Sequence, residues 1–221
     1  CMRMQPTVWA VLLSVGMAAE WPLFLMLVGN ILQSTSNILA TALGQSLSQL
    51  GGIALWLNFF RQVFRQGGLA SHHLMWNHVI CDRLRLWLRM VLIVAAVPTF
   101  LFLVVRNIPD QSDEVGRIIL ERLLFLVLMV CCTALLFRLF IPANTPFVRT
   151  LIGQSRFLRT TRYIWACSII VAPLLLATCS ATGFHHTALS LCERLGWSVI
   201  TASGIVLGWS FVMRWLRINH R

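Results

Sequence analysis

Six long apolar runs follow one another along the chain, and short polar stretches separate them. A helix needs about 20 apolar residues to cross the roughly 30 Å hydrocarbon core of a bilayer. Each run is about that long, so the pattern predicts an all-α fold, a polytopic transmembrane helix bundle of about six spans. The expected spans are residues 7–31, 38–60, 86–105, 118–140, 164–182 and 197–218.

Polar or helix-breaking residues interrupt the first two runs. Glu20, Trp21 and Pro22 lie within the first run, which predicts a kink or a split at that point. The second run contains glutamines, serines and the Gly51-Gly52 pair, so it is the most polar of the six.

Arginine supplies all 18 basic residues, and the arginines cluster at the ends of the apolar runs. Cytoplasmic loops near span ends carry an excess of positive residues. Six alternating spans place 14 arginines on one side of the membrane and 4 on the other. The side with 14 is therefore expected to be cytoplasmic, and both the N-terminus and the C-terminus are expected to face it.

The composition agrees with a membrane protein and argues against a basic nucleic-acid-binding module. Hydrophobic residues make up 58% of the chain and charged residues 11%, with a mean hydropathy of +0.78. A nucleic-acid module would spread its charge over a soluble face, whereas here the formal charge of +11 sits at the edges of apolar runs. Membrane lipids are therefore the expected partners, and nucleic acid is not. The seven cysteines form no CxxC pair and are expected to be small buried hydrophobes.

Small residues recur at helical spacing in two of the expected spans. Helices in lipid pack most closely where small residues let their backbones approach. Ordinary tight packing is the favoured interpretation of this spacing, and a helix pair that slides under load is the alternative. The predicted packing positions are Ala40, Gly44, Ser48 and Gly52 in the second span, and Gly204 and Gly208 in the sixth.

Two ionisable groups within or near the spans suggest possible functions. A carboxylate deep in a span is costly and is often functional, so Glu20 is a candidate for an ion or proton pathway, unless Trp21-Pro22 marks a helix end at the interface. His185 and His186 fall in an expected extracytoplasmic loop. Imidazole there could sense pH, although an ordinary loop position is favoured.

His72, His73, His78 and Cys81 lie close together and are residue types that bind metals. Their spacing matches no common zinc pattern. A loop at the level of the lipid headgroups is therefore the favoured interpretation, and neither a metal nor a cofactor is predicted.

Arginine and tryptophan at the expected cytoplasmic span ends are candidate anchors in the inner leaflet. Arg156, Arg159 and Arg162 recur every third position. Residues 144–163 are too polar for a voltage-sensing span, so they are expected to form an amphipathic helix on anionic lipid. The remaining predicted anchors are Trp76, Arg83, Arg85, Trp87, Arg89, Trp215 and Arg217.

Three short stretches resemble one family of channels. These are Arg65-Gln66-Gly67-Gly68-Leu69-Ala70 with His73 and Trp76 after it, Gly183-Phe184-His185-His186-Thr187-Ala188-Leu189 with Glu193-Arg194-Leu195 after it, and Arg214-Trp215-Leu216. In that order they resemble the inner-membrane region of the large, multi-span members of the small-conductance mechanosensitive channel superfamily. These are the potassium-efflux-type channels of bacterial inner membranes.

The resemblance implies a multi-pass protein of the bacterial inner membrane that forms a homo-oligomer, with a heptamer as the candidate stoichiometry. It also implies a periplasmic region, a pore helix and a cytoplasmic β-rich vestibule, which this chain does not contain. Residues 1–221 are therefore expected to be one transmembrane domain, a piece of a longer channel subunit. Its expected function is peripheral tension sensing in a channel that opens under membrane stretch during hypo-osmotic shock.

Two other functions compete with this prediction. A secondary transporter, or its membrane subunit, would need a midplane site formed by broken helices, with Glu20 in the pathway. A membrane scaffold without transport is the second alternative. An enzyme is not expected, because the chain contains no GxSxG, Walker or HExxH motif, and no small-molecule substrate is predicted.

Overall fold

The computed structural model describes residues 5–65, 78–108, 114–140 and 156–219. These residues form six α-helices, which confirms the predicted all-α fold for the described part of the chain. The helices are α1 (Gln5–Gln33), α2 (Ile38–Val63), α3 (His78–Asn107), α4 (Glu114–Phe140), α6 (Arg156–Ala181) and α7 (His185–Asn219).

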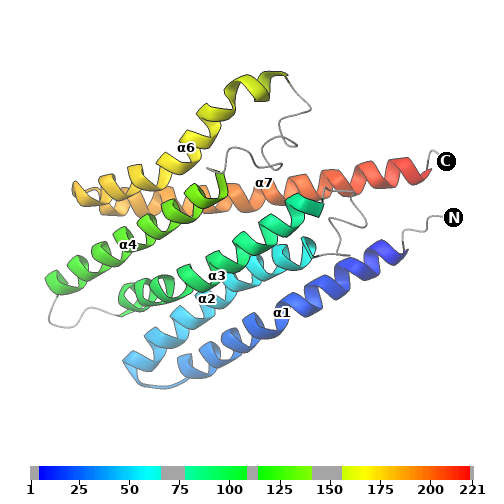
Figure 1. Cartoon of the computed structure of the whole chain (residues 1–221). Coiled ribbons are helices and arrows are strands. Elements are labelled where there is room, and N and C mark those ends of the chain that lie inside the picture. The colour runs from blue at the N-terminus through cyan, green and yellow to red at the C-terminus, as the bar shows by residue number, and fades with distance from the viewer. Residues whose placement is uncertain (1–4, 66–77, 109–113, 141–155, 220–221) are drawn as a thin grey trace.

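Successive helices run antiparallel, and the main packing contacts join neighbours in the chain sequence. The first helix and the last therefore have their free ends on the same side of the molecule (Figure 1). That arrangement agrees with an even number of crossings and with two termini facing the same compartment. The assignment of that compartment as the cytoplasm stays a prediction.

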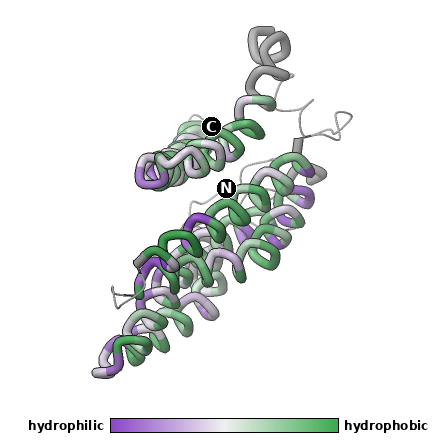
Figure 2. The backbone as a smooth tube through the Cα atoms, turned by 90° about the vertical axis from the view of Figure 1, so that its left-hand side faces the viewer, coloured by the Kyte–Doolittle hydropathy of each residue, from purple (hydrophilic) through white to green (hydrophobic). Residues whose placement is uncertain are grey.

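Within the residues that the structure describes, three helices are long and apolar enough to cross a membrane by length and composition: Ile38–Val63, Cys81–Asn107 and Val115–Leu139. In α6 the apolar segment is shorter, Cys167–Ala181. At 1.5 Å per residue, α1 and α7 extend about 43 Å and about 52 Å, each more than a hydrocarbon core of about 30 Å. Their assignment as further spans stays a prediction. Hydrophobic residues occupy much of each coloured helix in Figure 2.

Large apolar side chains face outward over much of the bundle. Trp21 is 74% exposed, Val115 72% and Val199 68%. Soluble monomers rarely expose contiguous apolar surface of this extent. Lipid is the natural solvent for these faces because their side chains are apolar, and a helix can enter lipid because the backbone groups of its interior bond to one another.

The helices extend beyond the expected apolar spans. α3 begins eight residues before its expected span, α6 eight residues and α7 twelve. Hydropathy detects only the part of a helix that matches the bilayer, whereas the backbone hydrogen bonds continue through polar turns. The expected extracytoplasmic loop before residue 197 is therefore mostly helix, and Glu193 and Arg194 belong to α7.

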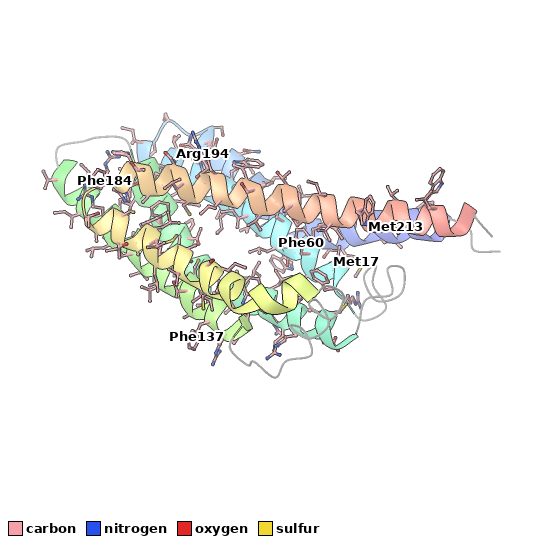
Figure 3. The ribbon with its side chains drawn as sticks, turned by 90° about the horizontal axis from the view of Figure 1, so that it is seen from above. Met17, Phe60, Phe137, Phe184, Arg194 and Met213 are labelled. Carbon is pink, nitrogen blue, oxygen red and sulfur yellow. The ribbon has the colours of Figure 1, made fainter. Side chains whose placement is uncertain are left out.

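A glycine ends α6 and allows the chain to reverse into α7. Gly183 has φ +104°, a conformation that residues with a Cβ rarely adopt. The Phe184 N–H donates to the Cys179 carbonyl at 3.0 Å and the Gly183 N–H to the Ser180 carbonyl at 3.4 Å. These two bonds form a Schellman cap. Figure 3 shows Phe184 at this turn and Met213 at the opposite end of α7.

Among the described residues, two clusters of buried apolar side chains join α2, α3, α4, α6 and α7. The first joins α3, α4, α6 and α7 and includes Phe102, Phe125 and Ala188. The second lies where α2 ends and α3 begins and includes Val63, Cys81 and Leu88, with Leu207 of α7 against it.

Candidate functional site

The contact between α1 and α2 depends on the absence of side chains. A Cβ added to Gly29 would lie 2.6 Å from the Gly44 carbonyl oxygen, and one added to Gly44 would lie 2.5 Å from the Gly29 carbonyl oxygen. Ser48 also lies at this contact, since its backbone nitrogen would be 2.9 Å from a Gly29 Cβ. Gly44 and Ser48 thus lie on the α1 face of α2. Gly29 was not predicted, because it stands alone among larger residues of α1.

The next turn of α2 accommodates the proline of α1. A Cβ on Gly51 would lie 2.8 Å from Cγ of Met26 and 3.0 Å from the Pro22 carbonyl oxygen. Gly52 is less tightly packed, with Cε of Met26 at 3.6 Å, and Ala40 is half-buried. Gly51 thus makes the closer contact.

α1 is a single helix through Pro22, and α2 is a single helix through Gly51 and Gly52, so the expected split in the first span does not occur. Proline is tolerated in such a helix because neighbouring groups satisfy the freed backbone. Glu20 lies on an exposed face in the middle of α1. Pro22 of α1 and Gly51 of α2 therefore pack against each other within unbroken helices, which leaves no break beside Glu20.

The glycine pair of α7 is arranged differently. A Cβ at Gly204 or Gly208 would meet nothing within 4 Å, and both residues are exposed. The predicted packing face therefore has no partner among the described residues.

Polar side chains tie adjacent helices at both ends of the bundle. At the end away from the termini, Nδ2 of Asn107 donates to Oγ of Ser46 at 3.0 Å and to Oε1 of Gln49 at 3.3 Å, which joins α3 to α2. Near the other end, Nε1 of Trp87 donates to the Leu135 carbonyl at 2.8 Å, which joins α3 to α4. Trp87 thus makes a helix-to-helix contact in addition to its predicted anchoring role.

His185, the first residue of α7, is buried where α4, α6 and α7 meet, and it is only 3% exposed. Its Nδ1 lies 2.8 Å from Oγ of Ser180 in α6, and its Nε2 lies 3.6 Å from Oε1 of Glu121 in α4. The ring also packs edge-on against Phe125, with 5.5 Å between the ring centres. The stretch from Gly183 to Leu189, which carries the family resemblance, therefore places a buried imidazole between three helices. The expected loop position is wrong for His185. His186 is exposed.

Burial lowers the pKa of His185, while the Glu121 carboxylate opposes this shift. Arg122 and His186 lower the pKa further through charge repulsion. The neutral imidazole is therefore favoured in the folded protein.

At the end that bears the termini, arginines from α2 and α3 surround a cavity of about 430 Å³. The cavity is lined by Arg61, Asp82, Arg85, Leu86 and Arg89. Arg85 and Arg89 were predicted as anchors, whereas Arg61 was not.

The other predicted anchors are distributed over three places. Arg83 is half-buried on α3. Arg156, Arg159 and Arg162 occupy the first turns of α6, which continues directly into the apolar segment, so residues 156–163 are not a separate surface helix. The rest of the expected amphipathic helix, residues 144–155, lies outside the described residues. Trp215 is half-exposed in the last turns of α7, which also contain Arg217. Trp76, His72 and His73 lie outside the described residues.

His78 is the first residue of α3. No group of three or more potential metal ligands occurs among the residues that the structure describes.

Long helices with apolar outer faces and arginine-rich ends define a polytopic α-helical membrane protein. The family model for "mechanosensitive ion channel inner membrane domain 1" matches residues 2–221. The chain belongs to this family, so the predicted resemblance is confirmed, and the family comprises channel membrane regions rather than enzymes. Searches of curated proteins and of solved structures gave no significant match.

Proposed function

We propose that this chain is the peripheral, tension-sensing membrane region of a bacterial mechanosensitive channel. The channel would open under membrane stretch during hypo-osmotic shock. The observation that carries the proposal is the match of an ion-channel membrane-domain family to residues 2–221. The channel is proposed to be a homo-oligomer in the bacterial inner membrane, with seven subunits as the candidate number.

Tension can open a channel only if the open state occupies more bilayer area than the closed state. The α1–α2 pair, locked through Gly29 and Gly44, would move as one unit as the bilayer thins. Ties such as that of Trp87 to Leu135 would pass the movement to the next helices. The arginines at the ends of the helices would hold them at the headgroups while they tilt.

Patch recordings test the tension-sensing role. Neutralising Arg156, Arg159 and Arg162 together, as glutamines, should raise the tension needed for opening, because α6 loses its hold on the inner leaflet. Arg106→Gln, at the opposite end of α3, is the matched control and should have a smaller effect. An unchanged threshold in the triple variant would reject these arginines as anchors.

A transporter role for Glu20 gains no support from the fold, since α1 and α2 are unbroken. Glu20→Gln should therefore leave channel conductance and tension threshold close to those of the wild type. Substrate-dependent flux that disappears in this variant would favour the transporter instead.

A further inference from the structure

We propose that the cavity between the end of α2 and the start of α3 binds a single phosphate group, most simply the headgroup phosphate of an anionic phospholipid. The proposal rests on the membrane function above, and it replaces diffuse attraction to the inner leaflet with a defined site. The cavity has a volume of about 430 Å³.

The site is built by two helices that a buried contact fixes in position. Cys81 and Leu88 of α3 pack against Val63, the last residue of α2, and against Phe64, which caps it. That contact brings Arg61, near the end of α2, to the same cavity as Arg85 of α3. The two guanidinium groups therefore belong to a fixed pair of elements rather than to one flexible loop.

The charges around the cavity favour an anion. Arg85 and Arg89 are four residues apart and so lie on one face of α3, where like charges repel each other. Arg61 adds a third positive charge, and Asp82 provides the one carboxylate among the described residues of the lining, which leaves these residues with a formal excess of two positive charges. A phosphate group would relieve this repulsion, with one negative charge as a diester and up to two as the monoester of phosphatidic acid.

The chemistry of arginine favours a phosphate over other anions. The planar guanidinium fork forms paired hydrogen bonds to phosphate oxygens, and several forks can share one phosphate group. Leu86 supplies the apolar part of the wall, which suits the glycerol and first acyl carbons of a lipid. The cavity lies at the expected cytoplasmic ends of α2 and α3, where the positive-inside pattern leads us to expect lipid headgroups.

Binding of defined lipids to the purified full chain in detergent tests the site. Native mass spectrometry should show one phosphatidic acid per chain, bound at least about tenfold more tightly than phosphatidylcholine. Arg61→Gln combined with Arg85→Gln should abolish this preference, and the double lysine variant should lose part of it, because lysine lacks the fork. Arg138→Gln is the matched control. It removes an exposed arginine from the same end of the bundle but outside the cavity, and it should retain the preference.

Inorganic phosphate distinguishes the two sources of the ligand. If millimolar phosphate does not displace phosphatidic acid, the lipid headgroup is the ligand. If it displaces the lipid fully, the site takes a free phosphate group. Both results support a phosphate site, provided that circular dichroism shows every variant to be folded.

The proposal is overturned if wild-type protein shows no preference for phosphatidic acid, or if Arg138→Gln loses the preference as fully as the double variant. These measurements are made without tension. A channel that binds the lipid but ignores stretch would therefore contradict the proposed function alone.

Discussion

At the scale of single residues, two glycines and one buried histidine make the most specific contacts. Gly29 and Gly44 bring α1 and α2 into backbone contact. His185 fills the junction of α4, α6 and α7 and is held by Ser180. Each of these residues makes a contact that a larger or charged substitute would disturb.

Gly44→Ala should destabilise the protein by about 1–3 kcal/mol, the usual cost of overpacking a close contact. The added Cβ would meet the backbone oxygen of Gly29, which cannot move without separating the helices. Thermal unfolding in detergent measures the effect. Gly204→Ala is the control and should be neutral or slightly stabilising, since open space surrounds that position. Equal effects of the two substitutions would contradict the close packing.

Acidification should weaken the docking of the α6–α7 turn on α4. Since burial lowers the pKa of His185, the unfolded chain binds a proton below about pH 6.5 while the folded protein resists it. The contribution of the neutral His185 to the free energy of unfolding is therefore fully present above about pH 6.5. It is lost as the pH falls through the lower pKa that His185 has in the folded protein.

Unfolding midpoints in detergent at several pH values test this dependence. His185→Gln should flatten the profile, whereas His186→Gln, at the exposed neighbouring position, should leave it nearly unchanged. Three groups act on His185, namely Glu121 of α4, Arg122 of α4 and His186 of α7. A profile that stays steep in His185→Gln would assign the effect to another group.

At the scale of elements, the sequence predicted which segments form helices better than it predicted where they end. The apolar runs identify the helices because each run must match the bilayer. The ends were missed where α3, α6 and α7 continue into polar turns. Hydropathy falls in such turns, but the helix does not have to end there. Residues 156–163, for example, contain no proline or glycine that would interrupt it.

Gly183→Ala should cost about 1–3 kcal/mol, because a residue with a Cβ is strained at φ +104°. The change acts on the Schellman cap and therefore on the angle between α6 and α7. Denaturation in detergent measures the loss. Gly196→Ala, inside α7 with open space around it, provides the comparison and should be tolerated. If the two variants were equally stable, the turn at Gly183 would not determine the stability of the α6–α7 hairpin.

The candidate site was predicted in part. Arg85 and Arg89 stood out because they lie at the start of an apolar run. Their association with Arg61 depends on the packing of Val63 against α3, which no local pattern encodes. Gly29 was missed because no small residue stands three or four positions from it in α1. Conversely, Gly204 and Gly208 have the spacing of a packing motif without a neighbour in the described structure.

At the scale of the whole molecule, antiparallel neighbours distribute the arginines between two ends (Figure 1). Arg61, Arg85 and Arg138 lie on helix segments at the end that bears the termini. Arg106 and Arg194 lie toward the opposite end. This separation is the pattern that the positive-inside rule associates with a fixed orientation.

Cysteine labelling tests that orientation in intact cells and in inverted vesicles. Cysteines that replace Arg85 and Arg138 should react with an impermeant reagent only in inverted vesicles. A cysteine that replaces Arg194 should react in spheroplasts, because it lies toward the other end of the bundle. Because the chain has free cysteines of its own, such as the exposed Cys167, labelling is read in a background without them. Reaction of Arg85→Cys and Arg138→Cys from different sides would refute the topology.

The pairing of each helix mainly with its neighbours in the sequence also bears on biogenesis. Contacts between nearby segments form quickly and need no distant partner. The first hairpin can close through its two glycines as soon as its second helix leaves the translocon, before the ribosome has made the rest. Nascent chains arrested beyond the end of that hairpin should therefore already resist protease along its first two helices.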